Sequence, residues 1–220
     1  MITTEHAFHV NPTESVCFTG HRMIPHAVLP TLRERLRQTI RNAAQTGYRD
    51  FLCGGALGFD TIAAEEVLSL RESCHIRLSL VLPCENQSVR WQAGDQRRYQ
   101  DILQAADQSI FLAPAYYEGC MMARNAFMVD HASLCVCWLY TMKGGAFSTV
   151  RYAWNRNIPL INLAISPSDA TKRGPDQIFM REPVLWNSMF IFPSASKNAR
   201  TAILPPLRDR RHRWRYMSTH

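Results

Sequence analysis

Apolar and polar positions follow two alternating patterns through most of this 220-residue chain. Short apolar runs are typical of buried strands, whereas apolar residues repeated every three or four positions are typical of helices. Leu32, Leu36 and Ile40, for example, would share one face of a helix. These patterns predict strands at about 15–18, 50–53, 76–82, 108–112, 134–140 and 158–163, and helices at about 29–46, 61–72, 87–106, 120–131 and 147–155.

Strands that alternate with helices predict an α/β fold. We expect a Rossmann-like, doubly wound and mostly parallel sheet with helices on both faces. Right-handed crossovers would bring the loops that follow the strands to one edge of the sheet. The pattern divides the chain into an irregular lead-in (1–14), this domain (15–165) and a basic, partly irregular C-terminal extension (166–220).

Composition narrows the class of protein. Hydrophobic residues make up 46% and charged residues 20%, as in ordinary soluble domains. No apolar run reaches the roughly 20 residues of a membrane span, and residues 1–12 lack the apolar core of a secretion signal. The cysteines are odd in number and form no CxxC pair, which favours free thiols in a reducing compartment. We therefore expect a cytoplasmic protein without a membrane partner.

The net charge of +7 is concentrated in the extension. Residues 166–220 carry 10 Lys and Arg against 4 Asp and Glu, and arginines alternate with aromatic residues in 208–216. Such a segment either binds nucleic acid through phosphates and stacked bases or is a solvated terminus.

A glycine-rich turn follows the second predicted strand. Gly54, Gly55 and Gly58 precede a helix whose first turn contains Asp60. Glycines allow a phosphate close to backbone N–H groups at a helix start, although a tight strand–helix connection needs no ligand. Asp60 would either contact ribose hydroxyls or cap the helix.

Two more loops after predicted strands carry polar or glycine residues. Thr19, Gly20, His21 and Arg22 follow the first strand, and His21 is either a ligand contact or a structural histidine. The other loop contains Gly144 and Gly145, followed by Ser148 and Thr149 at a helix start. Backbone donors, hydroxyls and a carboxylate at one edge are what a nucleotide requires.

The helix predicted at 120–131 contains two polar residues on a mainly apolar segment. Arg124, if buried, needs an anionic partner, which would be a ligand phosphate or a carboxylate such as Asp130. Asn125 follows it directly. The histidines are scattered and no hydrolytic triad is evident, so we predict no catalytic residue and no metal.

Taken in order, several segments resemble the YpsA-like branch of the SLOG superfamily. They are 18–22, 54–60, 82–84 with Trp91 and Tyr99, 119–130, and 144–153. The resemblance covers about 15–165 and implies a site for a nucleotide or a nucleotide-derived ligand such as ADP-ribose, NAD or a nucleoside monophosphate. It also implies self-association, without naming a cofactor. For such a ligand-binding protein we expect a sensor or regulatory role.

The resemblance extends to relatives with other activities. LOG enzymes in this superfamily cleave the N-glycosidic bond of nucleotides with an Arg, to which Arg124 would correspond, and a Glu. The turn at 143–152 has no such Glu, so hydrolysis would need a carboxylate from Asp60 or Glu118. We therefore prefer ligand binding, with a nucleotide N-glycosidase as the alternative. A single-stranded nucleic-acid binder similar to DprA, acting through the basic tail, is a further alternative.

Overall fold

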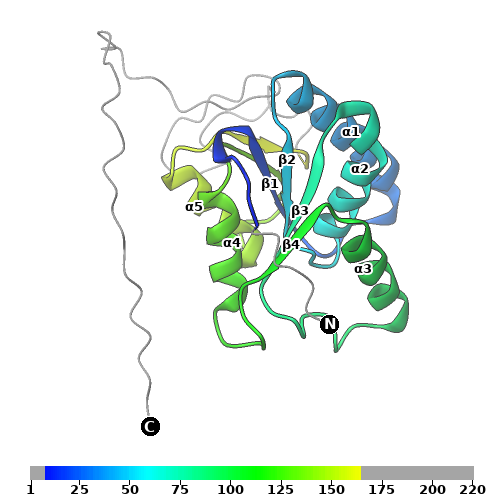
Figure 1. Cartoon of the computed structure of the whole chain (residues 1–220), viewed down its shortest axis with the longest axis vertical. Helices are drawn as coiled ribbons and strands as arrows, with labels where there is room; N and C mark the ends of the chain where they lie inside the picture. The colour runs from blue at the N-terminus through cyan, green and yellow to red at the C-terminus, as the bar shows by residue number, and fades with distance from the viewer. Residues whose placement is uncertain (1–7, 165–220) are drawn as a thin grey trace.

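A computed structural model describes residues 8–164 and places six parallel strands in one sheet. The strand order is β4-β3-β2-β1-β5-β6, which confirms the doubly wound α/β fold (Figure 1). The strands are β1 (Ser15–Gly20), β2 (Asp50–Cys53), β3 (Arg77–Leu82), β4 (Gln108–Phe111), β5 (Leu134–Trp138) and β6 (Leu160–Asn162).

The helices form one layer on each face of the sheet (Figure 1). Helices α1 (Leu29–Gln45), α2 (Phe59–Cys74) and α3 (Ala93–Ala105) cover one face. Helices α4 (Cys120–Asp130) and α5 (Gly144–Asn155) cover the other. The chain runs outward from β1 to β4 and then returns to β5 on the opposite side of β1. Right-handed crossovers that run in opposite directions along the sheet place their helices on opposite faces. The direction changes between β1 and β5, so these two strands flank the topological switch point of the sheet.

Side chains in the strands alternate between two apolar clusters. In β1, Val16 and Phe18 pack under α1 and α2, whereas Cys17 packs under α4 and α5. This follows from the two-residue period of a strand. Burial on both faces explains why the strands read as continuous apolar runs rather than as alternating ones.

Two helix starts differ from the predictions. The helix predicted from residue 87 begins at Ala93, because the preceding residues form turns whose Ser88 and Val89 carbonyls accept hydrogen bonds from the Gln96 side chain. Helix α5 begins at Gly144, so its two glycines form the first helical turn rather than a preceding loop. Residues 1–7 of the predicted lead-in and the whole predicted extension (166–220) lie outside the described residues.

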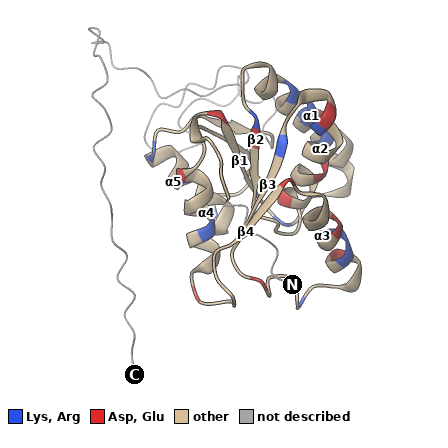
Figure 2. Ribbon diagram, in the orientation of Figure 1, with Lys and Arg blue, Asp and Glu red and all other residues tan. Residues whose placement is uncertain are grey.

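Ion pairs join α1, α2 and α3, whose ribbons carry both basic and acidic positions in Figure 2. Arg33 on α1 and Arg98 on α3 both bind Glu65, with N–O distances of 2.7 Å and 2.5 Å. Glu66 is buried and binds Arg37 at 2.6 Å. These contacts hold one helical layer together.

No helix within residues 8–164 is long and apolar enough to cross a membrane.

Candidate functional site

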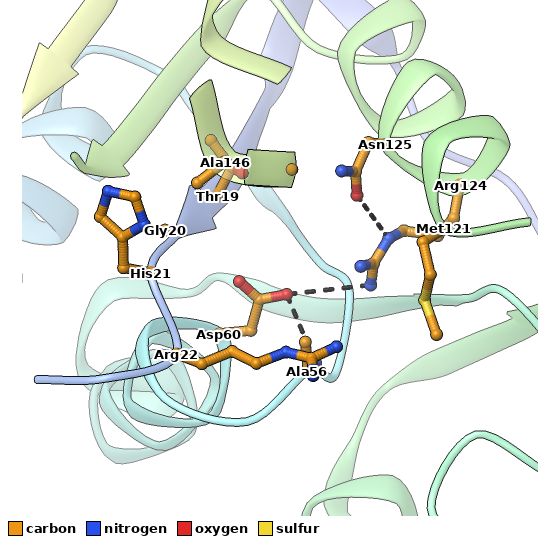
Figure 3. A pocket seen from close by; sticks show the side chains of 11 residues that line it. Thr19, Gly20, His21, Arg22, Ala56, Asp60, Met121, Arg124, Asn125 and Ala146 are labelled. Carbon is orange, nitrogen blue, oxygen red and sulfur yellow. Dashed lines mark hydrogen bonds and ion pairs between the residues drawn. The ribbon is translucent and has the colours of Figure 1, made fainter. Parts of the chain in front are cut away.

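A cavity of about 260 Å³ opens at the carboxyl end of β1, at the switch point of the sheet (Figure 3). Such crevices are the usual ligand sites of doubly wound sheets. It is lined by the end of β1 and the turn after it, the turn before α2 and the first turn of that helix, and helices α4 and α5: Thr19, Gly20, His21, Arg22, Ala56, Asp60, Met121, Arg124, Asn125, Gly145 and Ala146.

A buried ion pair forms one wall of the cavity. Arg124 and Asp60 are each only 5% exposed, and Arg124 Nη1 lies 3.8 Å from Asp60 Oδ2. Arg124 Nη1 also donates a hydrogen bond to the carbonyl of Gly54. Asp60 is therefore the structural partner of Arg124, whereas Asp130 binds Arg156. A buried guanidinium needs such partners because an isolated buried charge is costly.

Asn125 connects this pair to α5. Its side-chain oxygen accepts a hydrogen bond from Arg124 Nε at 2.7 Å, and its amide donates to Thr149 Oγ1 at 2.7 Å. Thr149 in turn donates to the Gly145 carbonyl at 2.8 Å. The relay fixes Arg124 relative to the first turn of α5, while Thr149 itself lies behind the cavity wall.

Opposing influences act on the Asp60 carboxyl. Burial raises its pKa above the ordinary value, and the charges of Arg124 and Arg22 and the Ala56 N–H oppose that rise. The Ala56 nitrogen lies 3.4 Å from Asp60 Oδ2. In Figure 3 the Arg22 side chain passes beneath the carboxylate towards Ala56. Burial outweighs these opposing influences, so this carboxyl holds its proton more readily than an ordinary aspartate does.

The start of α5 supplies backbone donors to the cavity. Lys143 is the N-cap and makes no side-chain capping bond, while Gly145 and Ala146 line the cavity. The first N–H groups of a helix have no partner within it and carry partial positive charge. This end of α5 can therefore receive an anionic group.

His21 is held at the rim. Its ring lies 4.3 Å from that of Tyr140, and its Nε2 accepts a hydrogen bond from the Thr141 N–H at 3.3 Å. Burial lowers the pKa of His21. We therefore assign the neutral ring with its proton on Nδ1, which leaves Arg22 as the exposed cation of this turn.

The glycine-rich turn after β2 lies behind the wall. A Cβ on Gly54 would overlap the Arg124 guanidinium, and one on Gly58 would overlap the Arg22 backbone. Gly55 faces Leu82, with 2.8 Å to a notional Cβ. These residues do not line the cavity, and their lack of side chains serves packing within the protein.

The predicted site residues thus divide into two sets. Thr19, Gly20, His21, Arg22, Asp60, Arg124, Asn125 and Gly145 come together at the cavity. The lining does not include Gly54, Gly55, Gly58, Gly144, Ser148 and Thr149. Ser148 instead lines a groove between α4 and α5.

Sequence reasoning missed Ala56, Met121 and Ala146 as lining residues. Met121 could have been found from its place about one turn before Arg124 on the same helix face. The two alanines carry no chemical signal, since only their position in the glycine-rich turns brings them to the cavity. Among residues 8–164, no group of three or more His, Cys, Asp and Glu side chains is arranged to hold a metal.

The sheet order and the cavity at its switch point define a Rossmann-like α/β protein. The sequence model of the YspA SLOG family matches residues 20–153, and the chain belongs to this family. This confirms the resemblance to the SLOG superfamily.

Curated relatives are UPF0398 proteins. That of Halalkalibacterium halodurans is 32% identical over 108 residues, which are 48% of this chain and 57% of that protein. That of Listeria innocua is 28% identical over 102 residues, or 46% and 56% of the two chains. The chain thus spans little more than half the length of these relatives.

One solved structure shows similarity of fold, and another matches more weakly. DNA processing protein A from Helicobacter pylori, described for its single-stranded DNA binding mode, is 22% identical with a TM-score of 0.50. The match covers 68% of this chain and 64% of that one. The molybdenum cofactor carrier protein of Chlamydomonas reinhardtii is 15% identical with a TM-score of 0.41, and 73% and 82% of the two chains are covered.

Proposed function

We propose that this protein binds a nucleotide or nucleotide-derived ligand in the cavity at the carboxyl end of β1 and acts as a sensor or regulatory domain. One observation carries the proposal: the buried Arg124–Asp60 pair and the uncapped start of α5 border the same cavity. Cations and helix N–H groups suit phosphate, and a carboxylate suits ribose hydroxyls. The seven free thiols support a reducing, cytoplasmic location.

Each group has a distinct task in this proposal. The N–H groups of Gly145 and Ala146 and the exposed Arg22 hold phosphate oxygens. Asp60 accepts hydrogen bonds from ribose hydroxyls. Arg124 is a fixed charge rather than a mobile one, because Asn125 holds its Nε group and Gly54 and Asp60 hold its Nη1 group. It attracts the anion and keeps Asp60 in place.

Cavity size limits how much of the ligand is enclosed. The volume of about 260 Å³ is below the range of about 300–1,000 Å³ that is usual for enclosed small-molecule sites. A ribose phosphate fits inside, and a base then lies at the rim. The exposed Tyr140, held against His21, offers a ring for stacking there.

The N-glycosidase alternative depends on Asp60. It is the one carboxylate that lines the cavity in the described part of the chain, because Glu118 is exposed and outside the lining and the first turn of α5 has no acid. Asp60 already pairs with Arg124, which favours binding over catalysis. Release of free base from a nucleoside monophosphate by the purified protein, lost in Asp60→Asn, would establish the alternative instead.

A thermal-shift screen tests the proposal. The panel is AMP, ADP-ribose, NAD, ATP and cyclic dinucleotides, and a ligand at 100 times its Kd should stabilise the protein by about 2.7 kcal/mol. The blocking variant is Gly145→Asp, which puts a carboxylate at the cavity where a Cβ meets no atom within 4 Å. The matched control is Ser148→Asp, which adds the same charge to α5 in the neighbouring groove.

The expected result is a shift that Gly145→Asp abolishes and Ser148→Asp retains. An acid near the start of a helix favours the fold, so loss of binding would not reflect unfolding. If no nucleotide shifts the wild type at millimolar concentration, the proposal fails. Binding of single-stranded DNA by the full chain, equal in wild type and Gly145→Asp, would point to the nucleic-acid alternative.

A further inference from the structure

Lysine occurs once between residues 8 and 164, and this residue, Lys143, lies beside the mouth of the cavity. Two residues before it, Thr141 contacts the ring of His21, which lines the cavity. Two residues after it, Gly145 also lines the cavity. Lys143 itself is exposed. The backbone at Lys143 therefore passes the rim, and the long side chain starts there.

Lys143 is an unfavourable residue for its place in the fold. It is the N-cap of α5, where Ser, Thr, Asn and Asp are preferred because their side chains accept hydrogen bonds from helix N–H groups. The ammonium instead adds positive charge at the positive end of the helix, and the first turn of α5 contains no acid to offset it. Its side chain forms no hydrogen bond or ion pair with the described part of the chain. Such a local conflict is expected where a residue serves function rather than stability.

A second cation has a nitrogen group left open to the same cavity. Arg124 is 5% exposed and is part of the lining. Its Nε binds Asn125 and its Nη1 binds Gly54 and Asp60, but its Nη2 has no hydrogen bond or ion pair within residues 8–164. Figure 3 shows the guanidinium directed towards Asp60. A donor group on a buried side chain needs an acceptor, and a ligand in the cavity would supply one.

We propose that Lys143 and the Nη2 group of Arg124 form a phosphate subsite at the start of α5, in which Lys143 is the mobile contact. The inference rests on the proposed function, because it adds one residue and one donor group to the same site. Arg124 is fixed by its neighbours, whereas the Lys143 ammonium has three donors on a flexible four-carbon stem and can move to a ligand.

The charges of the site indicate the class of ligand. With Arg22, the two cations outnumber the Asp60 carboxylate at the cavity. A terminal phosphate group carries a charge of about −1.5 to −2 at pH 7 and offers three acceptor oxygens. It can therefore engage the ammonium, the guanidinium and the helix N–H groups together. A nucleoside without phosphate lacks this group and should not depend on Lys143.

Calorimetric titration of the full chain with AMP, adenosine and inorganic phosphate tests the subsite. The variant is Lys143→Gln, which removes the charge and keeps a long polar side chain. The matched control is Arg151→Gln, which removes a positive charge from an exposed position on the same helix, outside the cavity lining. The affinity for AMP should fall about tenfold in Lys143→Gln, the effect of one lost hydrogen bond to a charged group, and stay close to the wild-type value in Arg151→Gln.

Urea denaturation of the same proteins separates a role in binding from a role in folding. Removing the ammonium relieves repulsion at the positive end of α5, so Lys143→Gln should keep or raise the urea midpoint while it weakens AMP binding. A contact that only supports the fold would lower both together. Opposite signs of the two changes are therefore the expected signature.

Three results would overturn the proposal. They are an unchanged affinity of Lys143→Gln for both AMP and inorganic phosphate, an equal loss in Arg151→Gln, and a loss of binding that accompanies a lower urea midpoint. Nucleotide binding that Lys143→Gln leaves unchanged would refute the subsite and retain the proposed function. Binding of inorganic phosphate that depends on Lys143, without binding of any nucleotide, would retain the subsite and refute the proposed function.

Discussion

The two glycine-rich turns of this protein look alike in sequence but lie in different surroundings. At the turn after β2, Gly54 and Gly58 leave no space for a side chain, because the Arg124 guanidinium and the Arg22 backbone occupy it. At the start of α5, a Cβ on Gly144 or Gly145 would meet no atom within 4 Å. In the first turn, other parts of the protein fill the space beside the glycines, whereas in the second turn that space is empty and Gly145 lines the cavity.

The difference shows that a glycine cluster after a strand has two physical causes. In the first turn, absent side chains let distant parts of the chain approach, and the result is the placement of Arg124 and Arg22. In the second, absent side chains leave backbone N–H groups accessible. Under the proposed function, the first turn would act on a ligand indirectly, through the arginines, and the second would contact it directly.

The largest loss of stability is expected from the substitution Gly58→Ala. This residue has φ +84°, and an added Cβ overlaps backbone atoms of Arg22, which cannot move as a side chain can. Strain and overpacking together should lower the free energy of unfolding by about 4 kcal/mol. Urea denaturation measures the loss.

Gly47→Ala is the matched control for that variant. Gly47 also has positive φ, +104°, but an added Cβ meets nothing within 4 Å. Its loss should be about 1 kcal/mol from backbone conformation alone. Equal losses in both variants would show that close approach to Arg22 does not matter.

Arg124→Met should have the next largest effect. It leaves the Asp60 carboxylate buried without its cationic partner, and breaking a buried pair costs about 3 kcal/mol. Arg156→Met breaks the more exposed pair with Asp130 and should cost about 0.5 kcal/mol or less. Urea denaturation at pH 7 compares them, and similar losses would contradict the structural role given to Arg124.

Gly145→Ala should affect binding more than folding. Alanine in a helix raises the free energy of unfolding by about 0.5 kcal/mol, since nothing obstructs the added Cβ. The methyl group enters the proposed anion site, and the affinity for the best nucleotide of the panel should fall about tenfold, or 1.4 kcal/mol.

Gly94→Ala on α3 is the control, because its Cβ also meets nothing within 4 Å and it lies outside the cavity lining. It should raise stability similarly and leave the affinity unchanged in calorimetric titration. An unchanged affinity in Gly145→Ala as well would show that the open turn does not contact the ligand.

The smallest expected effect is the dependence of the free energy of unfolding on pH. The pKa of Asp60 is raised in the folded protein, mainly by burial, so the folded state holds its proton at pH values where the unfolded state has lost it. Stability therefore falls as pH rises from the ordinary carboxyl pKa through the raised folded one. Asp60→Asn lacks this contribution.

The wild type minus Asp60→Asn difference in free energy of unfolding should therefore decline as pH rises from about 4 to 7. Urea denaturation of both proteins across this range measures it. A difference that grows with pH would mean that Arg124 outweighs burial at Asp60.

Local sequence patterns were sufficient to predict the helices and strands but not the residues at which they begin and end. Helix α1 was predictable because Leu32, Leu36 and Ile40 repeat along one face and are all buried. The start of α3 was not, because the Gln96 side chain stabilises the preceding turns through contacts that periodicity does not contain. Likewise, Gly144 has the φ of a loop residue, +78°, yet it begins a helix.

The sequence by itself determined the alternation of strands and helices, the parallel sheet, and the edge at which polar loops gather. These features depend on side-chain periodicity and the handedness of crossovers, which act over short stretches of chain. Only the tertiary structure decided that Asp60 and not Asp130 pairs with Arg124, and that Gly54 faces Arg124 rather than a ligand. Those contacts join residues as far as 70 positions apart, and their geometry depends on how α4 packs against the sheet.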